Sequence, residues 1–205
     1  MYKKPLIVFE GIEGSGKTSH IKYLANYLRK KRIQFIKIRE PGGTKTAEKI
    51  RKLLLNKNSK FDKKTDLLLY LAARNENIKK IIQPNYKKKI ILIDRFIDST
   101  LAYQHYGMGI NYKFINEINN IITKNIRTRI TFLNLVSMQN MRKRLMKRKK
   151  LNRYDMFKTK FYKKVQNGFV KIAKKSKNKY IYIDSNKKID LNRRLIIKEI
   201  NKILK

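Results

Sequence analysis

The chain of 205 residues contains 53 lysines and arginines, 14 aspartates and glutamates and no cysteine, which gives a formal net charge of +39. This length suits one α/β domain, and the lack of cysteine excludes disulfides, thiolate zinc sites and cysteine nucleophiles. No stretch approaches the length of a membrane span and no cleavage pattern precedes the first strand, so we expect a soluble, cytoplasmic protein that does not enter a membrane.

The charge of +39 has two interpretations. A polycation attracts nucleic acid and phosphorylated ligands. Alternatively, the protein has a biased composition, rich in Lys, Asn and Ile, in which lysine has replaced neutral surface residues wherever the fold tolerated it. The lysines are scattered through almost every segment and form no stripe interleaved with aromatics, which favours the second interpretation. We therefore expect nucleic-acid binding to be only non-specific, if it occurs.

Apolar runs that predict strands alternate with segments of helical spacing along the whole chain. The predicted strands span residues 6–10, 34–38, 89–94, 129–135 and 180–183. Helices are predicted around residues 21–28, 46–55, 65–82, 98–106, 112–122, 161–172 and 191–203. A further helix is predicted after Ser137, its candidate cap, and runs into the basic stretch 142–153. The alternation predicts a parallel sheet with helices on both faces, without repeats or an internal linker.

Two of these helices carry specific expectations. The helix at 65–82 should end before Pro84 and present one apolar face, made of Leu67, Leu68, Leu71 and Ala72. The last helix should bury Leu191, Leu195, Ile196, Ile200 and Ile203.

The first strand is followed by a phosphate-binding motif. Residues 11–18, GIEGSGKT, fit G-x-x-x-x-G-K-[ST] and stand between a strand and a helix. The glycines let backbone N–H groups form a concave anion site, and the helix N-terminus adds its dipole. Lys17 would reach the β- and γ-phosphates, and Thr18 would contact Mg²⁺. The motif predicts an ATP site, and with the alternation of five strands and helices above it predicts a P-loop NTPase-type, doubly wound, five-stranded parallel sheet.

Three further stretches narrow the reaction. They are REPGGT at 39–44, YLAAR at 70–74, and DRF at 94–96 followed by STLAYQ at 99–104. Together with GIEGSGKT, and in this order, they resemble the thymidylate kinase family over essentially the whole chain. The resemblance implies a single P-loop kinase domain over residues 1–205, with a basic lid at about 146–157. It implies transfer of the γ-phosphoryl group of ATP to dTMP, giving dTDP and ADP, with Mg²⁺ as cofactor and a homodimer formed by helices.

The resemblance also implies roles for individual residues. ATP would bind to the phosphate loop through Gly11, Ile12, Glu13, Gly14, Ser15, Gly16, Lys17 and Thr18. The dTMP site would consist of Glu13, Arg39, Pro41, Tyr70, Arg74, Arg95, Ser99, Thr100, Tyr103 and Gln104. Guanidinium groups match phosphate oxygens, and an aromatic ring suits a pyrimidine face. Asp94 and Thr18 would hold Mg²⁺.

The resemblance also implies where charge on the transferred group is neutralised: one branch of the family uses an arginine in the phosphate loop, which is lacking here, and the other branch uses an arginine of the lid. The sequence LNRYD at 151–155 resembles the family's lid, which makes Arg153 the candidate catalytic arginine beside Lys17 and Arg95. Nearby substitutes are Arg148, Lys149 and Lys150. The chain departs from the family's usual acids at Asn152, Asp155 and Asn134.

Two alternatives remain at this point. One is a kinase that acts on another nucleotide or nucleoside. The other is a nucleic-acid-binding P-loop ATPase, which would require a groove with exposed stacking aromatics. His20 and His105 have no carboxylate or second histidine at ligand spacing, so neither is assigned a catalytic or metal-binding role.

Overall fold

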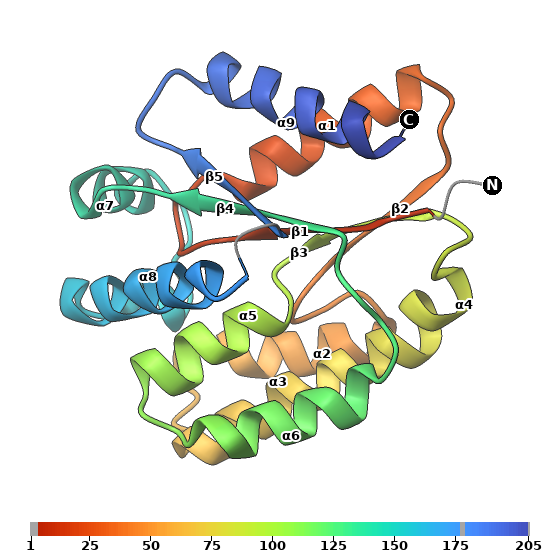
Figure 1. The fold of residues 1–205 in the computed structure, drawn as a ribbon. Coiled ribbons are helices and arrows are strands. Elements are labelled where there is room, and N and C mark those ends of the chain that lie inside the picture. Colours follow the sequence, from red (N-terminus) through yellow and green to blue (C-terminus); the bar gives the residue numbers. More distant parts are fainter. Residues whose placement is uncertain (1–3, 177–178, 205) are drawn as a thin grey trace.

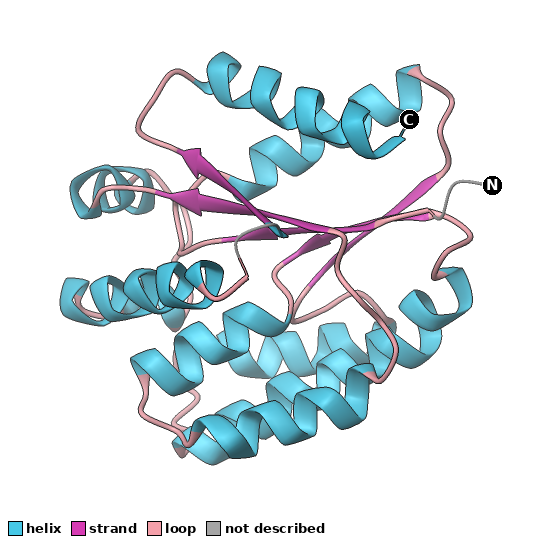
Figure 2. Ribbon diagram, viewed as in Figure 1, coloured by secondary structure: helices cyan, strands magenta, loops and turns pink. Residues whose placement is uncertain are grey.

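The computed structural model describes residues 4–176 and 179–204 as one parallel sheet with helices packed on both faces (Figures 1 and 2). The strands are β1 Leu6–Glu10, β2 Phe35–Arg39, β3 Ile90–Asp94, β4 Ile130–Leu135 and β5 Tyr180–Asp184. They lie in the order β2-β3-β1-β4-β5, and every pair is parallel. The predicted α/β, doubly wound, five-stranded sheet is confirmed.

Helices follow every strand. They are α1 Lys17–Lys30, α2 Lys45–Leu55, α3 Lys63–Asn77, α4 Gln83–Asn85, α5 Ile97–Thr100, α6 Tyr112–Thr123, α7 Met138–Met146, α8 Thr159–Lys174 and α9 Ile189–Leu204. Two π segments, η1 Ile78–Ile82 and η2 Leu101–Gly107, continue α3 and α5, and η3 Tyr154–Met156 is a 3₁₀ turn. Helices α1 and α9 cover one face of the sheet, while α2, α3, α5, α6 and α8 lie on the other side (Figure 1).

The central strands are buried on both faces, which explains their unbroken apolar sequences. Successive side chains of β1 alternate between the two cores. Ile7 and Phe9 join the core beneath α1 and α9, whereas Leu6 and Val8 join the core on the opposite face. No helix of the described residues is both long enough and apolar enough to cross a membrane.

Two helices differ from expectation. Pro84 does not end the helical path as expected: the backbone stays helical from α3 through η1 into the three-residue α4, which has Pro84 in its first turn. Leu68 and Ala72 do not share the buried face of Leu67; Leu68 is 50% exposed. Leu191, expected in the core, is 51% exposed because it stands in the first turn of α9 and faces outward.

The carboxyl ends of the strands bring the predicted motifs to one edge of the sheet. Asp94 at the end of β3 pairs in register with Phe9 of β1 and with Arg39 of β2. β1 lies between β3 and β4, where the order of the strands reverses. Ligands of open α/β sheets bind at such a point, so the fold predicts a ligand site beside the loop after β1.

Candidate active site

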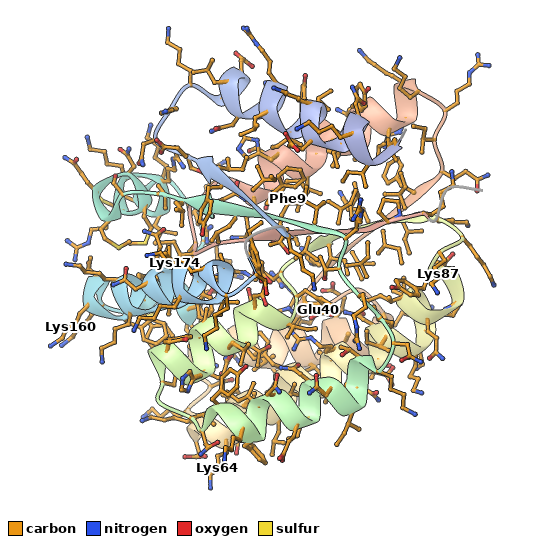
Figure 3. The ribbon with its side chains drawn as sticks, viewed as in Figure 1. Phe9, Glu40, Lys64, Lys87, Lys160 and Lys174 are labelled. Carbon is orange, nitrogen blue, oxygen red and sulfur yellow. The ribbon has the colours of Figure 1, made fainter. Side chains whose placement is uncertain are left out.

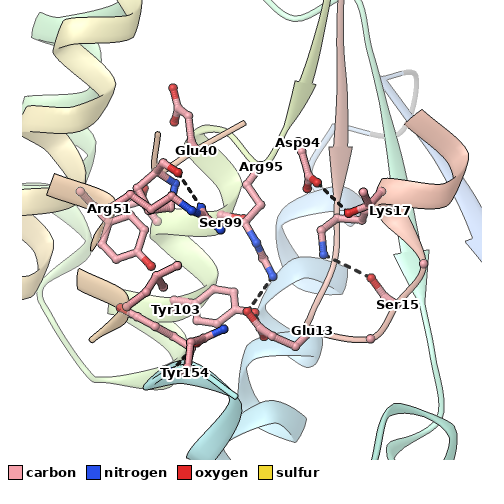
Figure 4. Close-up of a pocket in the computed structure, with 18 of the residues that line it drawn as sticks. Glu13, Ser15, Lys17, Glu40, Arg51, Asp94, Arg95, Ser99, Tyr103 and Tyr154 are labelled. Carbon is pink, nitrogen blue, oxygen red and sulfur yellow. Dashed lines mark hydrogen bonds and ion pairs between the residues drawn. The ribbon is translucent and has the colours of Figure 1, made fainter. Parts of the chain in front are cut away.

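A cavity of about 350 Å³ opens at this edge of the sheet (Figure 4). Fourteen of the predicted site residues line it: Glu13, Gly14, Ser15, Gly16, Lys17, Thr18, Pro41, Tyr70, Asp94, Arg95, Ser99, Thr100, Tyr103 and Gln104. They come from the phosphate loop, the loop after β2, α3 and the segment after β3. The cavity therefore joins the two halves of the predicted site.

The phosphate loop is shaped by its glycines. A Cβ on Gly11 would lie 2.4 Å from the backbone oxygen of Asn134, so β4 leaves no space for a side chain there. Gly16 caps α1 in the left-handed conformation, with φ of 84°. The Lys17 ammonium donates to the carbonyl oxygens of Gly11 and Ile12, both at 2.9 Å. Lys17 is thus held inside the curve of the loop.

Burial changes the proton affinity of two charged groups in the loop. It lowers the pKa of Lys17 from 10.5 to about 8, and the positive charge of Arg95 acts in the same direction. Burial acts to raise the pKa of Glu13, but the charges of Arg95 and Lys17 outweigh it and hold that pKa below its ordinary value. Glu13 is consequently an ionised acceptor at neutral pH.

Arg95 stands at the centre of the cavity. Its guanidinium donates to Glu13 at 2.8 Å and to the Gly11 carbonyl oxygen at 2.8 Å. Its backbone has φ of 68°, a left-handed conformation that is costly for a residue with a side chain. The guanidinium also lies over the Tyr103 ring, 5.1 Å from the centroid, and the Tyr103 hydroxyl donates to Glu13.

Glu10, the last residue of β1, supports the turn at Arg95 from behind. Its carboxyl oxygens accept from the Phe96 N–H at 2.7 Å and from the Ser99 hydroxyl at 2.5 Å. Burial and, to a lesser extent, repulsion from Asp98 raise the pKa of Glu10 to about 8. The end of the first strand therefore fixes the loop that carries Arg95.

The far end of the cavity has the chemistry of a base pocket. Tyr70 packs edge-on against Tyr154, with ring centroids 5.8 Å apart. The Thr100 hydroxyl is buried and has no hydrogen-bond partner among the described residues. Gln104 is buried, and its amide Nε2 donates to Asp66 at 3.2 Å. An aromatic face and polar groups at the pocket edge are what a pyrimidine requires.

Five predicted site residues do not line the cavity: Gly11, Ile12, Arg39, Arg74 and Arg153. Arg39 is exposed and pairs with Glu48 at 3.1 Å. The side chain of Arg74 is 2% exposed, and its guanidinium donates to Glu40 at 2.7 Å and to the Phe96 carbonyl oxygen at 2.9 Å. Arg74 thus connects the loops after β2 and β3 behind the cavity wall.

The segment predicted as the lid, at about 146–157, places a different arginine at the cavity from the one expected. Arg153 points toward α2 and α3, where it pairs with Asp66 and donates through Nε to the Leu54 carbonyl oxygen at 3.0 Å. Arg148 lines the cavity and pairs with Asp155 at 2.5 Å. Asn152, one of the departures noted above, donates to the same aspartate at 2.7 Å.

Four lining residues lie outside the motifs found in the sequence: Ser19, Arg51, Leu55 and Arg144. Arg51 donates to the Pro41 carbonyl oxygen at 2.6 Å, and Arg144 donates to the Gly14 carbonyl oxygen at 2.9 Å. Arg51 and Leu55 lie one turn apart on α2, so only their helical spacing could have indicated a shared face. Nothing local distinguishes Arg144 from the other basic residues of α7.

Both histidines lie in surroundings that suit a structural role. Burial, together with the charges of Arg193 and Arg144, lowers the pKa of His20 to about 4. His105 contacts the Ile110 carbonyl oxygen at 2.7 Å through Nδ1. Across residues 4–176 and 179–204, no group of three or more His, Cys, Asp or Glu side chains is placed to hold a metal ion.

Known proteins share both the sequence and the fold. The sequence model of the family described as Thymidylate kinase matches residues 9–196. A thymidylate kinase of Sulfurihydrogenibium sp. (strain YO3AOP1) is 41% identical over 97% of this chain and 93% of its own length. One from Acholeplasma laidlawii (strain PG-8A) is 38% identical over 97% of this chain and 99% of its own length.

A solved structure supports the same assignment. The crystal structure of thymidylate kinase from Ehrlichia chaffeensis superposes with a TM-score of 0.78 and is 36% identical, covering 96% of this chain and 98% of its own. The resemblance noted in the sequence is confirmed by sequence and structure together. The chain belongs to the thymidylate kinase family.

Proposed function

We propose that the cavity is where this enzyme transfers the γ-phosphoryl group of ATP to dTMP, giving dTDP and ADP. One observation carries the proposal: a phosphate loop and an aromatic pocket with an unpartnered hydroxyl line the two ends of the same cavity. Arg95 lies between them, beside the point where donor and acceptor phosphates would meet. Phosphoryl transfer needs positioning and charge neutralisation, and this arrangement supplies both.

At the donor end, ATP would lie along residues 11–18. Lys17 would turn from the loop carbonyls to the β- and γ-phosphates. Arg144 contacts Gly14 of the phosphate loop, Arg148 lines the same cavity, and both add positive charge. Because Arg148 lines the cavity and Arg153 does not, Arg148 is our candidate for the lid arginine, in place of the Arg153 that the sequence favoured.

Mg²⁺ is part of the proposal, and two residues fit it. The Thr18 hydroxyl donates to Asp94 Oδ2 at 3.2 Å, which brings a neutral oxygen and a carboxylate oxygen together beside the phosphate loop. Mg²⁺ is usually held by one or two protein oxygens, substrate phosphates and waters, so no larger acidic cluster is required. When bound, the ion would neutralise charge on the β- and γ-phosphates.

At the acceptor end, Tyr70 would stack on thymine, and Thr100 and Gln104 would bond its polar edge. The Glu13 carboxylate would accept from the 3′-hydroxyl, and Arg95 would bind the monophosphate. The predicted contacts of Arg39 and Arg74 with dTMP remain predictions, since each guanidinium would have to leave its carboxylate partner. Arg51 lines the cavity and is a further candidate for the acceptor phosphate.

A homodimer and a cytoplasmic location complete the proposal. Leu53 on α2 and Leu68 on α3 are 47% and 50% exposed, and these two helices pack together. A second copy would cover such apolar side chains. Sedimentation of the wild type and of Leu68→Glu tests the dimer, which the glutamate should weaken.

The activity is tested by a coupled assay with ATP, Mg²⁺ and dTMP, with UMP, dCMP and single-stranded DNA as alternative substrates or activators. We expect dTMP to be the preferred acceptor and Thr100→Val to raise its KM while leaving the fold intact. ATP hydrolysis stimulated by DNA, without phosphorylation of any nucleotide, would overturn the proposal.

A further inference from the structure

Asp66 is a buried carboxylate that meets two separate parts of the proposed site. It lies on α3, one turn before Tyr70, is 1% exposed and does not line the cavity. Arg153 and the Tyr154 hydroxyl, both from the lid, donate to it, the latter at 2.6 Å. From the other side, Gln104 Nε2 donates to it at 3.2 Å. One side chain therefore contacts both the lid and the base pocket.

On the lid side, Asp66 balances the charge of the residue that attaches the lid to α2. The Arg153 backbone N–H donates to the Leu55 carbonyl oxygen at 3.1 Å, and its Nε donates to the Leu54 carbonyl oxygen. The carbonyls of a last helical turn have no partner within the helix, so Arg153 satisfies groups that α2 leaves open. With the lid held in this way, Arg148 lines the cavity.

On the base side, Asp66 determines which way the Gln104 amide points. An ionised carboxylate only accepts hydrogen bonds, so Nε2 must face it. The amide oxygen is then the group left to face a ligand. Thymine and uracil present an N3–H donor at this edge, whereas cytosine presents an acceptor at the same position. An amide fixed in this orientation favours the first two bases.

We propose that Asp66 is a positioning residue that couples closure of the lid to recognition of a pyrimidine with an N3–H donor. The inference rests on the proposed function. Its distinctive consequence concerns Arg153, which neither lines the cavity nor contacts Gln104. Removing Arg153 deprives Asp66 of one hydrogen-bond partner. The Gln104 amide is then held less firmly, and the preference for a base with an N3–H donor decreases. A change in the lid is thereby felt in the base pocket.

The experiment compares Asp66→Asn and Arg153→Gln with the wild type, using ATP and either dTMP or dCMP. Asp66→Asn keeps the size of the side chain but loses the charge. For both variants we expect kcat with dTMP to fall about tenfold or more, and the kcat/KM ratio of dTMP to dCMP to narrow about tenfold, the equivalent of one hydrogen bond. The double variant should resemble the single ones, because both substitutions break the same connection.

Asp62→Asn is the matched control. It makes the same substitution one turn earlier on α3, at an exposed N-cap that asparagine also serves, so rate and base ratio should stay unchanged. A merely structural role of Asp66 would lower the melting temperature and the rate with both nucleotides equally. An unchanged dTMP/dCMP ratio in Arg153→Gln overturns the coupling, even if Asp66→Asn fails to fold. Failure of the wild type to phosphorylate dTMP would instead refute the proposed function.

Discussion

Lys17 combines a central place in the phosphate loop with an unusual proton affinity. Burial and the charge of Arg95 lower its pKa to about 8 in the free enzyme. Its protonated form binds phosphate, so kcat/KM for ATP should fall as the pH rises through about 8. Bound phosphates favour the charged form, and kcat itself should therefore fall only at higher pH. The measurement is a pH profile of both constants.

Lys17→Arg separates this effect from the titration of Glu10, whose pKa is also near 8. Arginine stays charged throughout the range. The activity of the variant should be lower, but its kcat/KM for ATP should lack the decline near pH 8. A decline that persists in Lys17→Arg would assign it to another group. Because the folded state lowers the pKa of Lys17, this residue should also make stability rise with pH between about 8 and 10.5.

Tyr103 should select the sugar of the acceptor. Its ring is 4% exposed beneath Arg95, and its hydroxyl donates to Glu13, the expected partner of the 3′-hydroxyl. An unpaired ribose 2′-hydroxyl against this ring would cost about 1–3 kcal/mol. Tyr103→Ala should narrow the preference for dUMP over UMP about ten- to a hundredfold in kcat/KM. Tyr103→Phe, which keeps the ring, should retain the preference; equal losses in both variants would show that the hydroxyl selects the sugar.

The sequence located residues whose place depends on a motif and a strand end, such as Lys17, Thr18 and Asp94. It could not tell which carboxylates face an arginine. Arg74 and Arg153 lie in recognised motifs, yet Glu40 and Asp66, distant in the chain, hold them away from the cavity. Such pairings depend on how α2, α3 and the lid meet in space, and no local pattern encodes that geometry.

The contact between α8 and η2 is close enough to be sensitive to one methyl group. A Cβ on Gly168 would lie 2.7 Å from Tyr106 Cβ, in the segment that carries Tyr103 and Gln104. Alanine adds about 1 kcal/mol of helix propensity, but overpacking costs about 1–3 kcal/mol. At this distance we expect Gly168→Ala to lower the free energy of unfolding in urea and to raise KM for dTMP.

Asn167→Ala is the control on the same helix, at an exposed position next to Gly168. It adds helix propensity without a new contact, so stability should stay equal or rise slightly. If Gly168→Ala proved as stable as Asn167→Ala and bound dTMP normally, the spacing between α8 and η2 would be adjustable and the packing argument wrong.

Helices and strands were predictable where one face or both faces are apolar. The strands were located to within one residue because their apolar runs are continuous. The π segments were not foreseen, since side-chain periodicity over five to seven residues barely separates them from α-helix. Leu191 was misplaced because helical spacing does not reveal where a terminal turn leaves the core.

Over the whole molecule, acidic and basic groups occupy different places. Of the 14 acidic residues, half line the cavity or lie close behind it: Glu10, Glu13, Glu40, Asp66, Asp94, Asp98 and Asp155. Lys64 on α3 and Lys160 on α8 project outward, as does Lys87 in the turn after α4 (Figure 3). Few acidic residues remain on the surface to balance its lysines and arginines. These surface cations must therefore repel one another strongly.

Salt should therefore stabilise the protein. Raising the ionic strength from about 0.01 M to about 1 M shortens the screening length from about 30 Å to about 3 Å, which weakens repulsion among surface cations more than it weakens the buried pairs. We expect the melting temperature to rise steadily with sodium chloride. A higher melting temperature in sulfate than in chloride at equal ionic strength would reveal anion binding at the phosphate loop. Lys17→Ala should abolish this difference between the two salts. A melting temperature that falls with chloride would refute net repulsion.

The wide turn of η2 makes this segment tolerant of a change in length. The Met108 N–H bonds to the Tyr103 carbonyl oxygen, five residues back, where an α-helix would reach back only four. Deleting one residue between Gln104 and Met108 would let the same carbonyl bond four residues on, and the residues before and after the turn would keep their orientation. The same deletion in the regular helix α8 would rotate every later side chain by roughly 100°. The segment after β3 can therefore lose one residue and still hold Tyr103 and Gln104 at the cavity.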